Sequence, residues 1–292
     1  MTFEPRKNEH PSTYIVPDRD NQNELVRLTI QDRLLTASMG GVLAEQENQA
    51  NLRRVLDIGC GTGGWALEAV QTYPDLTLVA GIDISQRMIS YAREQAESQQ
   101  VARRTEFHVM DALRMLEFPD DFFDLVNMRL GGSWLRTWDW PKLLGEISRI
   151  LRPKGIVRIT EQEIMHERSS QAATRINEMV LNAFYRAGHL FEATSTGLTE
   201  RLPSLLARHE FTRVQRRAHA LTYRAGAPET QMYNEDMIAA SRTLRPFLEK
   251  WGCLSPDYEE LCQQLVEETQ SPTFYSVWHF QTIWGVKPYT AS

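Results

Sequence analysis

Short apolar runs alternate with stretches of helical periodicity through the first half of the chain. The apolar runs predict strands at 54–58, 76–82, 105–110, 123–128 and 156–161. The periodic stretches between them predict helices at 65–73, 86–99 and 140–151, and Ser85 can cap the second of these. Strands separated by helices of this length favour right-handed crossovers and a mostly parallel sheet, whose ligands bind beyond the carboxyl ends of the strands.

The two ends of the chain follow different patterns. Residues 1–20 are polar and predict an irregular arm, and a helical pattern follows from 23 to about 47, which Gly40 and Gly41 can bend or end. After residue 162 the periodicity predicts helices at 167–191, 200–209, 236–251 and 258–268 and strands at 211–223 and 275–286. We expect the insertions at 163–200 and 226–274 to form a helical lid together with the arm.

The pattern as a whole predicts an α/β protein. We expect a Rossmann-like, seven-stranded, mostly parallel sheet with helices on both faces, plus the helical lid and the N-terminal arm. No linker separates two cores, so residues 1–292 are expected to form one domain. Its parts would be the arm and first helix (1–45), a ligand-binding core (46–162) and a C-terminal part with the lid insertions (163–292).

Composition and charge narrow the class of protein. The 292 residues include 32 Lys or Arg and 38 Asp or Glu, and this net charge of -6 argues against a nucleic-acid partner. The three cysteines, Cys60, Cys253 and Cys262, follow no disulfide or zinc spacing, which predicts reduced thiols and no metal site. Without an apolar leader or a run of about 18 apolar residues, we expect a cytoplasmic protein with no membrane partner.

A glycine-rich turn follows the first predicted strand. Glycine lets the backbone turn tightly and approach a ligand closely. The candidate ligand contacts in this turn are Gly59, Cys60, Gly61 and Gly63. Asp57 places a carboxylate beside the turn, where it can attract the cationic end of a ligand.

Two further acids end the next two strands. Asp83 ends the second strand, about twenty residues beyond the turn, where a carboxylate can accept both hydroxyl hydrogens of a ribose. Asp111, followed by Ala112, ends the third strand, where a carboxylate can hydrogen-bond an adenine amino group. Acids at three consecutive strand ends fit a ligand that carries an amino acid, a ribose and an adenine.

A dinucleotide site is the main alternative for this turn. Gly59, Gly61 and Gly64 satisfy the pattern Gly-x-Gly-x-x-Gly, and Asp83 suits the ribose of NAD as well. Asp57 argues against NAD, because an acid two residues before the first glycine sits badly near a pyrophosphate. Asp111 has no required role for NAD.

These motifs resemble those of the class I S-adenosylmethionine-dependent methyltransferases. The resemblance covers about residues 52–162 and rests on the segments 57–63, 81–85, 111–112 and 151–155. It implies S-adenosylmethionine as cofactor, bound by the residues above together with Ile84 and Met88. It also implies SN2 transfer of a methyl group to an O, N or C nucleophile, for which alignment in a dry pocket supplies much of the catalysis and a general base is optional.

The N-terminal segment resembles a methyltransferase subgroup of secondary metabolism that acts on small molecules. The similarity rests on residues 14–18 and 24–28 and on Gln31, with Val16 and Asp18 where the subgroup usually has Leu and Asn. The resemblance implies that Tyr14 and Gln31 contact the cofactor; the alternative is an arm that only packs on the surface. A small, aromatic or hydrophobic metabolite is therefore the expected acceptor.

The acceptor is expected near the loop that follows the fourth strand. This loop departs from the Asn/Asp-Pro-Pro-Tyr signature used on amino groups of DNA bases and glutamine, and Asn127 and Arg129 can orient the acceptor or the cofactor carboxylate. Trp134 follows, with Trp138 and Trp140, and indoles could form a pocket wall or simply pack in the core. The further pocket candidates are Tyr185, His189 and Tyr233.

Two residues after strand five are candidates for a general base. His166 and Glu163 follow Glu161 near the expected switch point of the sheet, although a lone His there is often only a hydrogen-bonded surface group. Three other possibilities stay open: a regulatory protein that binds the cofactor without transferring methyl, a methyltransferase acting on protein or RNA, and a homodimer.

Overall fold

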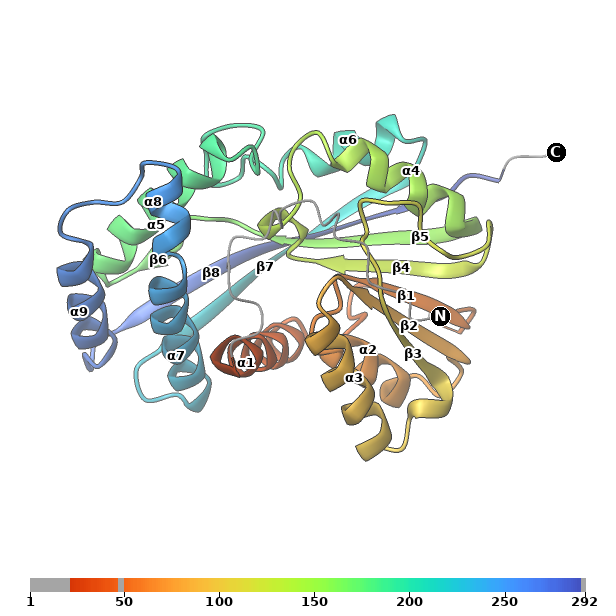
Figure 1. The fold of residues 1–292 in the computed structure, drawn as a ribbon, viewed down its shortest axis with the longest axis horizontal. Coiled ribbons are helices and arrows are strands. Elements are labelled where there is room, and N and C mark those ends of the chain that lie inside the picture. Colours follow the sequence, from red (N-terminus) through yellow and green to blue (C-terminus); the bar gives the residue numbers. More distant parts are fainter. Residues whose placement is uncertain (1–21, 47–49, 290–292) are drawn as a thin grey trace, which may run out of the picture.

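The computed structural model describes residues 22–46 and 50–289. Within these residues, eight strands form a single sheet in the order β3-β2-β1-β4-β5-β8-β6, with β7 on the other side of β8 (Figure 1). The parallel strands are β1 (Arg54–Ile58), β2 (Leu78–Asp83), β3 (Thr105–Val109), β4 (Phe123–Arg129) and β5 (Leu151–Gln162). The strand β8 (Tyr275–Val286) runs antiparallel to β5, to β6 (Glu167–Arg168) and to β7 (Thr212–Arg224). The mostly parallel α/β sheet expected from the sequence is thus confirmed.

Alternate residues of the central strands pack on opposite faces of the sheet. In β1, Val55 belongs to the core under α2 (Gly64–Thr72) and α3 (Gln86–Ser98), whereas Leu56 and Ile58 belong to the core under α4 (Trp140–Ile150) and α6 (Leu202–Arg208). Both faces are buried, which explains why these strands are continuous apolar runs in the sequence.

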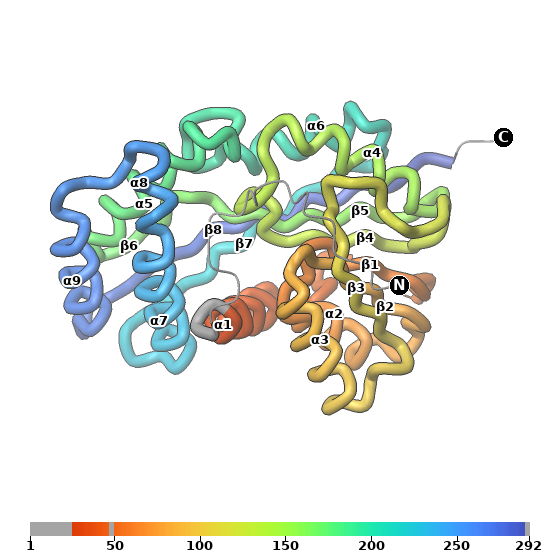
Figure 2. The backbone as a smooth tube through the Cα atoms, in the orientation of Figure 1, coloured from red at the N-terminus to blue at the C-terminus, as the bar shows by residue number. Residues whose placement is uncertain are grey.

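The remaining helices gather around the β7–β8 end of the sheet, where α1 (Gln22–Ser38) lies beside α7 (Pro228–Thr243) (Figure 2). The side chains of Leu35 and Tyr233 pack there with Tyr223 and Phe280 of the two strands. The other helices at this end are α5 (Gln171–Arg186), α8 (Arg245–Lys250) and α9 (Tyr258–Thr269). Among the helices that the structure describes, none is both long and apolar enough for a membrane crossing.

Two predictions of local structure were wrong. Residues 167–168 form an eighth, two-residue strand and do not begin a helix, because Ser170 caps α5 by accepting a hydrogen bond from the Ala173 backbone N–H at 3.0 Å. The helix expected at 236–251 is divided into α7 and α8 and begins earlier, since Pro228 and Pro246 each occupy the first turn of a new helix.

The two tryptophans that flank the start of α4 differ completely in burial. Trp140 is fully buried in the core cluster, whereas Trp138 is 62% exposed and neither lines a cavity. We expect Trp140→Ala to lower the free energy of unfolding by about 3 kcal/mol or more, because it opens a large hole in a packed core. Trp138→Ala is the matched control and should change stability by no more than about 0.5 kcal/mol. Urea denaturation of both variants measures this, and equal losses would contradict the assignment of Trp140 to the core.

Candidate functional site

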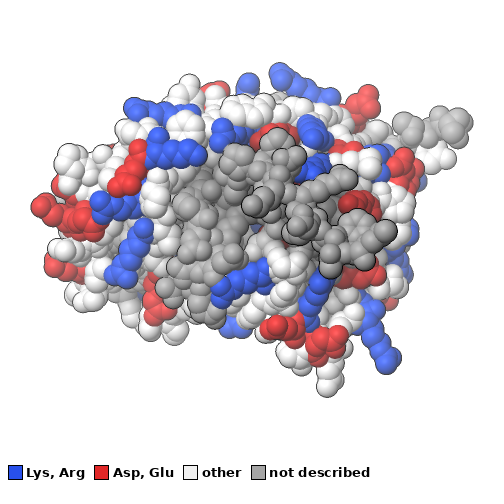
Figure 3. Space-filling view, in the orientation of Figure 1, with Lys and Arg blue, Asp and Glu red and all other residues white. Residues whose placement is uncertain are grey.

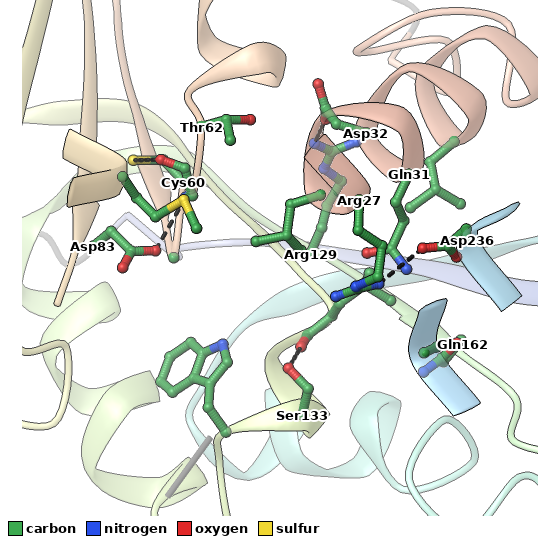
Figure 4. Close-up of a pocket in the computed structure, with 18 of the residues that line it drawn as sticks. Arg27, Gln31, Asp32, Cys60, Thr62, Asp83, Arg129, Ser133, Gln162 and Asp236 are labelled. Carbon is green, nitrogen blue, oxygen red and sulfur yellow. Dashed lines mark hydrogen bonds and ion pairs between the residues drawn. The ribbon is translucent and has the colours of Figure 1, made fainter. Parts of the chain in front are cut away.

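A cavity of about 360 Å³ lies beyond the carboxyl ends of the parallel strands, between them and the helices α1, α5 and α7. We call the part lined by residues 57–62, 82–88 and 110–113 the loop end. The part lined by residues 162–168, α5, α7 and Trp278 is the lid end. Figure 4 shows Cys60 and Asp83 on one side of this cavity and Gln162 and Asp236 on the other, with Arg129 between them.

The glycine turn at the loop end has the backbone that the sequence predicts. Gly59 and Gly61 have φ values of 67° and 51°, a region that side chains with a Cβ disfavour. A Cβ added to Gly61 would meet nothing within 4 Å, so the turn borders open space. Gly63 does not line the cavity; its Cβ would lie 2.8 Å from the Cβ of Ala92, so this glycine allows α2 to pack closely on α3.

The carboxylate of Asp83 ties the end of β2 to the glycine turn. Its Oδ2 accepts a hydrogen bond from the Gly61 backbone N–H at 3.0 Å, and its Oδ1 accepts one from the Ser85 N–H at 2.8 Å. Each carboxylate oxygen has a second lone pair, so Asp83 can still accept hydrogen bonds from a ligand in the cavity.

The other predicted contacts of the loop end also line the cavity. Asp111 lies there with its Oδ1 fixed by the Leu113 backbone N–H at 2.9 Å. The remaining ones are Cys60, Ile84, Met88, Ala112 and, from α1, Gln31. Tyr14 lies outside the described residues.

A buried chain of polar side chains orients Asp57. The Nδ2 of Asn127 donates to Asp57 Oδ1 at 2.7 Å, and Arg158 Nη1 donates to Asn127 Oδ1 at 2.7 Å. Arg158 in turn pairs with Glu45 at 2.5 Å. Asn127 is fully buried and does not line the cavity, so it lies behind Asp57. The sequence had instead suggested that Asn127 contacts a ligand.

Asp57 and Arg129 both line the cavity, and the charge of Arg129 acts on the pKa of Asp57. Burial raises the pKa of Asp57 to about 7, although the charge of Arg129 and the hydrogen bond from Asn127 both act to lower it. Arg129 donates to Thr36 Oγ1 at 3.2 Å and pairs with Asp32. A ligand cation beside Asp57 would favour its ionised form.

Asp32 of α1 reaches the first turn of α2. A Cβ on Gly64 would collide with the Asp32 carboxylate, so a larger residue there would have to displace this side chain. The carboxylate therefore lies near the positive end of the helix dipole and beside Arg129. Asp32 was not among the residues expected at the site from the sequence. It could have been found there because it follows Gln31 and lies one helical turn from Leu28 and Leu35, which also line the cavity.

The lid end joins an aromatic wall to a histidine. His166 Nδ1 lies 3.3 Å from the Tyr233 hydroxyl, which is 2.8 Å from Ser276 Oγ. Tyr233 stacks on Tyr223 with 4.1 Å between ring centroids, and the ring of His166 lies 5.4 Å from that of Trp278. Burial and the charge of Arg168 hold the pKa of His166 well below its usual value, so the imidazole is neutral near pH 7.

Several predicted residues are separated from this wall. Tyr185 is 47% exposed on α5, and His189 is buried in the core with its Nδ1 2.8 Å from the Leu135 carbonyl oxygen; neither lines the cavity. Glu163 does not line it either, and its backbone N–H donates to the His279 carbonyl in the sheet. Trp134 and Tyr233 do line it.

An ion pair in the cavity wall was not foreseen from the sequence. Arg27 of α1 donates to Asp236 of α7 at 2.9 Å, and both side chains are buried. Gln162 at the end of β5 also lines the cavity and accepts a hydrogen bond from Trp278 Nε1 at 3.1 Å. The two ion-pair partners are 209 positions apart, so no local pattern could have linked them.

A buried carboxyl supports the loop that follows β4. Glu161 Oε1 accepts a hydrogen bond from the Gly132 backbone N–H at 3.1 Å, and burial raises the pKa of Glu161 to about 8. This native pKa lies above the ordinary value of 4.5. The protonated Glu161 carboxyl therefore contributes its full stabilisation of the folded state below about pH 4.5. This contribution is lost as the pH rises to about 8.

We expect Glu161→Gln, which keeps the acceptor but cannot ionise, to gain stability relative to the wild type as the pH rises. Between about pH 5 and 8 the gain should approach about 1.4 kcal/mol per pH unit. Urea denaturation along this range measures it. Glu106→Gln, on an exposed part of β3, leaves every buried group in place and should follow the wild-type profile. A constant difference between Glu161→Gln and the wild type would show that Glu161 is ionised throughout.

Comparison with known proteins gives matches to methyltransferases. Residues 55–155 match a family model described as "Methyltransferase domain". The chain is 33% identical over 147 residues to a demethylmenaquinone methyltransferase of Deinococcus radiodurans, covering 50% of this chain and 56% of that protein. It is 37% identical over 109 residues to phosphoethanolamine N-methyltransferase 3 of Arabidopsis thaliana, covering 37% of this chain and 21% of the relative. The chain thus spans about half or less of the length of these relatives.

Solved structures share the fold. A Haemonchus contortus phosphoethanolamine N-methyltransferase 2, solved with phosphomonomethylethanolamine and S-adenosylhomocysteine, aligns with a TM-score of 0.57 and 21% identity over 95% of this chain and 61% of that one. The YcgJ protein of Bacillus subtilis aligns with a TM-score of 0.51 and 17% identity over 82% of this chain and 95% of that one. Residues 55–155 are thus similar to a methyltransferase domain, and the chain shares the fold of these solved structures.

Proposed function

We propose that this protein transfers a methyl group from S-adenosylmethionine to an O, N or C nucleophile of a small metabolite with an aromatic or apolar body. The observation that carries the proposal is a single cavity that joins two different surfaces. Its loop end gathers the carboxylates of Asp57, Asp83 and Asp111 from three successive strand ends. Its lid end offers rings such as Tyr233 and Trp278 beside a neutral His166.

The loop end fits the cofactor by the chemistry of its donors and acceptors. Asp57 and Arg129 would receive the amino and carboxylate groups of the cofactor's amino-acid part. Asp83 would accept hydrogen bonds from the ribose hydroxyls, and Asp111 one from the adenine amino group. The open space at Gly61 leaves room for a ligand against the turn. When bound, the cofactor supplies an electrophilic methyl group on a sulfonium.

The protein's own residues would then orient the acceptor and exclude water. The Arg27–Asp236 ion pair connects α1 with α7 over the cavity, and Trp134 and Phe184 contribute apolar wall. A transfer between two bound partners depends mainly on their alignment. His166, neutral and facing the cavity, is our candidate for removing a proton from an acceptor hydroxyl or amine.

The shape of the site supports a metabolite over a macromolecule. A cavity of about 360 Å³ with a largely apolar wall suits a small ligand, whereas a protein or RNA substrate needs an extended surface. In the parts drawn in colour in Figure 3, basic and acidic side chains are intermixed over the visible face and form no single basic patch. The resemblance of segments 14–18 and 24–28 to enzymes of secondary metabolism points to a small molecule as well. Relatives named for demethylmenaquinone and for phosphoethanolamine differ in their acceptors, so the methylated atom stays open among O, N and C.

The proposed cofactor is tested by calorimetric titration of the full chain with S-adenosylmethionine, S-adenosylhomocysteine and NAD. We expect the two sulfur compounds to bind and NAD not to bind. Asp83→Ala should weaken binding of both by about tenfold or more, because it removes acceptors for the ribose hydroxyls. Asp75→Ala, an exposed acid that precedes the same strand, is the control and should bind like the wild type. Binding of NAD alone would contradict the proposal, as would full affinity of the Asp83 variant.

The role of His166 is tested by initial rates of methyl transfer to a panel of aromatic hydroxyl and amine acceptors, detected as a mass gain of one methylene unit. We expect His166→Gln to lower kcat by about a hundredfold, in the range of general-base catalysis, while the affinity for S-adenosylmethionine stays unchanged. His108→Gln on β3, away from the cavity, is the control. A variant that turns over at the wild-type rate would remove His166 as a base.

A further inference from the structure

Arg168 is a half-buried arginine at the lid end without an acidic partner among the described residues. It is the second residue of β6, pairs through its backbone with Ser276 of β8 and lines the cavity. The neighbouring Glu167 cannot serve it, because successive strand residues point to opposite faces. Glu167 is exposed and lies 3.6 Å from His279 Nε2.

One nitrogen of the Arg168 guanidinium has a hydrogen-bond partner, and two have none among the described residues. Its Nη1 donates to the sulfur of Met237 at 3.5 Å. Its Nε and Nη2 are buried and have no hydrogen-bond partner among the described residues. These two nitrogens lie on one edge of the guanidinium plane, whose parallel N–H groups match the two oxygens of a carboxylate or phosphate. Leaving such charged donors unpaired and out of water is costly.

The other acids of the cavity wall have partners of their own. Asp236 is paired with Arg27, and Asp32 with Arg129. Asp57, Asp83 and Asp111 belong to the loop end. The described residues of the cavity wall therefore offer no free carboxylate to the unpaired Nε and Nη2 of Arg168. A molecule bound in the cavity can supply one when the guanidinium turns this edge toward it.

We propose that Arg168 binds an anionic group of the acceptor, a carboxylate or a phosphate, so that the metabolite methylated here is an acid with an aromatic or apolar body. This inference rests on the proposed function, because it names the class of acceptor held in the same cavity. Arg168 would fix the acid end through a two-pronged contact, while the aromatic wall holds the body. His166, Tyr233 and Trp278 provide that wall beside it.

The arrangement gives the acceptor a direction. Arg168 lies at the lid end, whereas the carboxylates proposed for the cofactor lie at the loop end. An acceptor anchored by its acid at Arg168 would extend its other end toward the cofactor. A neutral analogue would lose this anchor and leave the two nitrogens unpaired, so it should bind more weakly.

The test uses the full chain saturated with S-adenosylhomocysteine and titrated with benzoate, phenyl phosphate and the neutral benzamide. We expect at least one of the two anions to bind about tenfold or more tightly than benzamide. A preference for benzoate would identify a carboxylate acceptor, and a preference for phenyl phosphate would identify a phosphate. Equal binding of anions and amide, or no binding of either anion, would overturn the proposal.

Variants of Arg168 show whether its guanidinium, and not the rest of the cavity, produces the preference for anions. Arg168→Met should lose the preference for the anion while it binds benzamide and S-adenosylhomocysteine like the wild type. Arg168→Lys keeps the charge without the fork and should restore part of the preference. Arg175→Met, an exposed arginine of α5 paired with Asp257, is the matched control and should keep all of it. Retention of the preference in Arg168→Met would overturn the proposal.

The design also distinguishes a failure of the proposed function. If S-adenosylhomocysteine does not bind, the proposed cofactor is wrong. The three titrations are then repeated on the protein alone, where the same dependence on Arg168 supports the anion site. If methyl transfer is found and Arg168→Met methylates acidic and neutral acceptors as the wild type does, the function stands and the anion site is overturned.

Discussion

The chain of buried contacts from Glu45 through Arg158 and Asn127 to Asp57 is the interaction on which the site depends. Arg158 lies in the middle of β5 and is 1% exposed, so its charge must be balanced inside the protein. Burial acts to raise the pKa of Glu45, but the charge and hydrogen bonds of Arg158 outweigh it and lower that pKa. Losing one partner of such a pair costs several kcal/mol, because the other charge stays buried. The stability of the sheet and the orientation of Asp57 are thus coupled through three side chains.

Burial also makes the ionised form of Asp57, the last residue of this series of contacts, unfavourable. Asp57 has a pKa of about 7 because it is removed from water, and Arg129 is shared with Asp32. A cation bound beside Asp57 would relieve this cost, so ligand binding and ionisation of Asp57 favour each other. Active sites commonly give up stability in this way to present charges to a ligand. Glu161 shows the same compromise two strands away, on β5, where a buried carboxyl supports the Gly132 backbone.

The two ends of the cavity are built on different principles. At the loop end, backbone N–H groups of short turns hold the carboxylates of Asp83 and Asp111 in place. At the lid end, α5, α7, β6 and β8 each contribute side chains, and the ion pair between Arg27 and Asp236 joins α7 to α1. Variation in the lid end can therefore change the acceptor without disturbing the loop end.

The sequence by itself determined the sheet from β1 to β5 and the loop end, because each signal there is local. Apolar runs mark strands buried on both faces, and Asp57, Asp83 and Asp111 follow those strands directly. The tertiary structure alone decided the lid end. Asn127 supports Asp57, and Tyr185 and His189 lie outside the cavity, because packing between distant segments decides which side chains face the site. Arg168 could not be identified from the sequence either, because most arginines lie on the surface. Only the packing of β6 shows that its Nε and Nη2 are buried without a hydrogen-bond partner among the described residues.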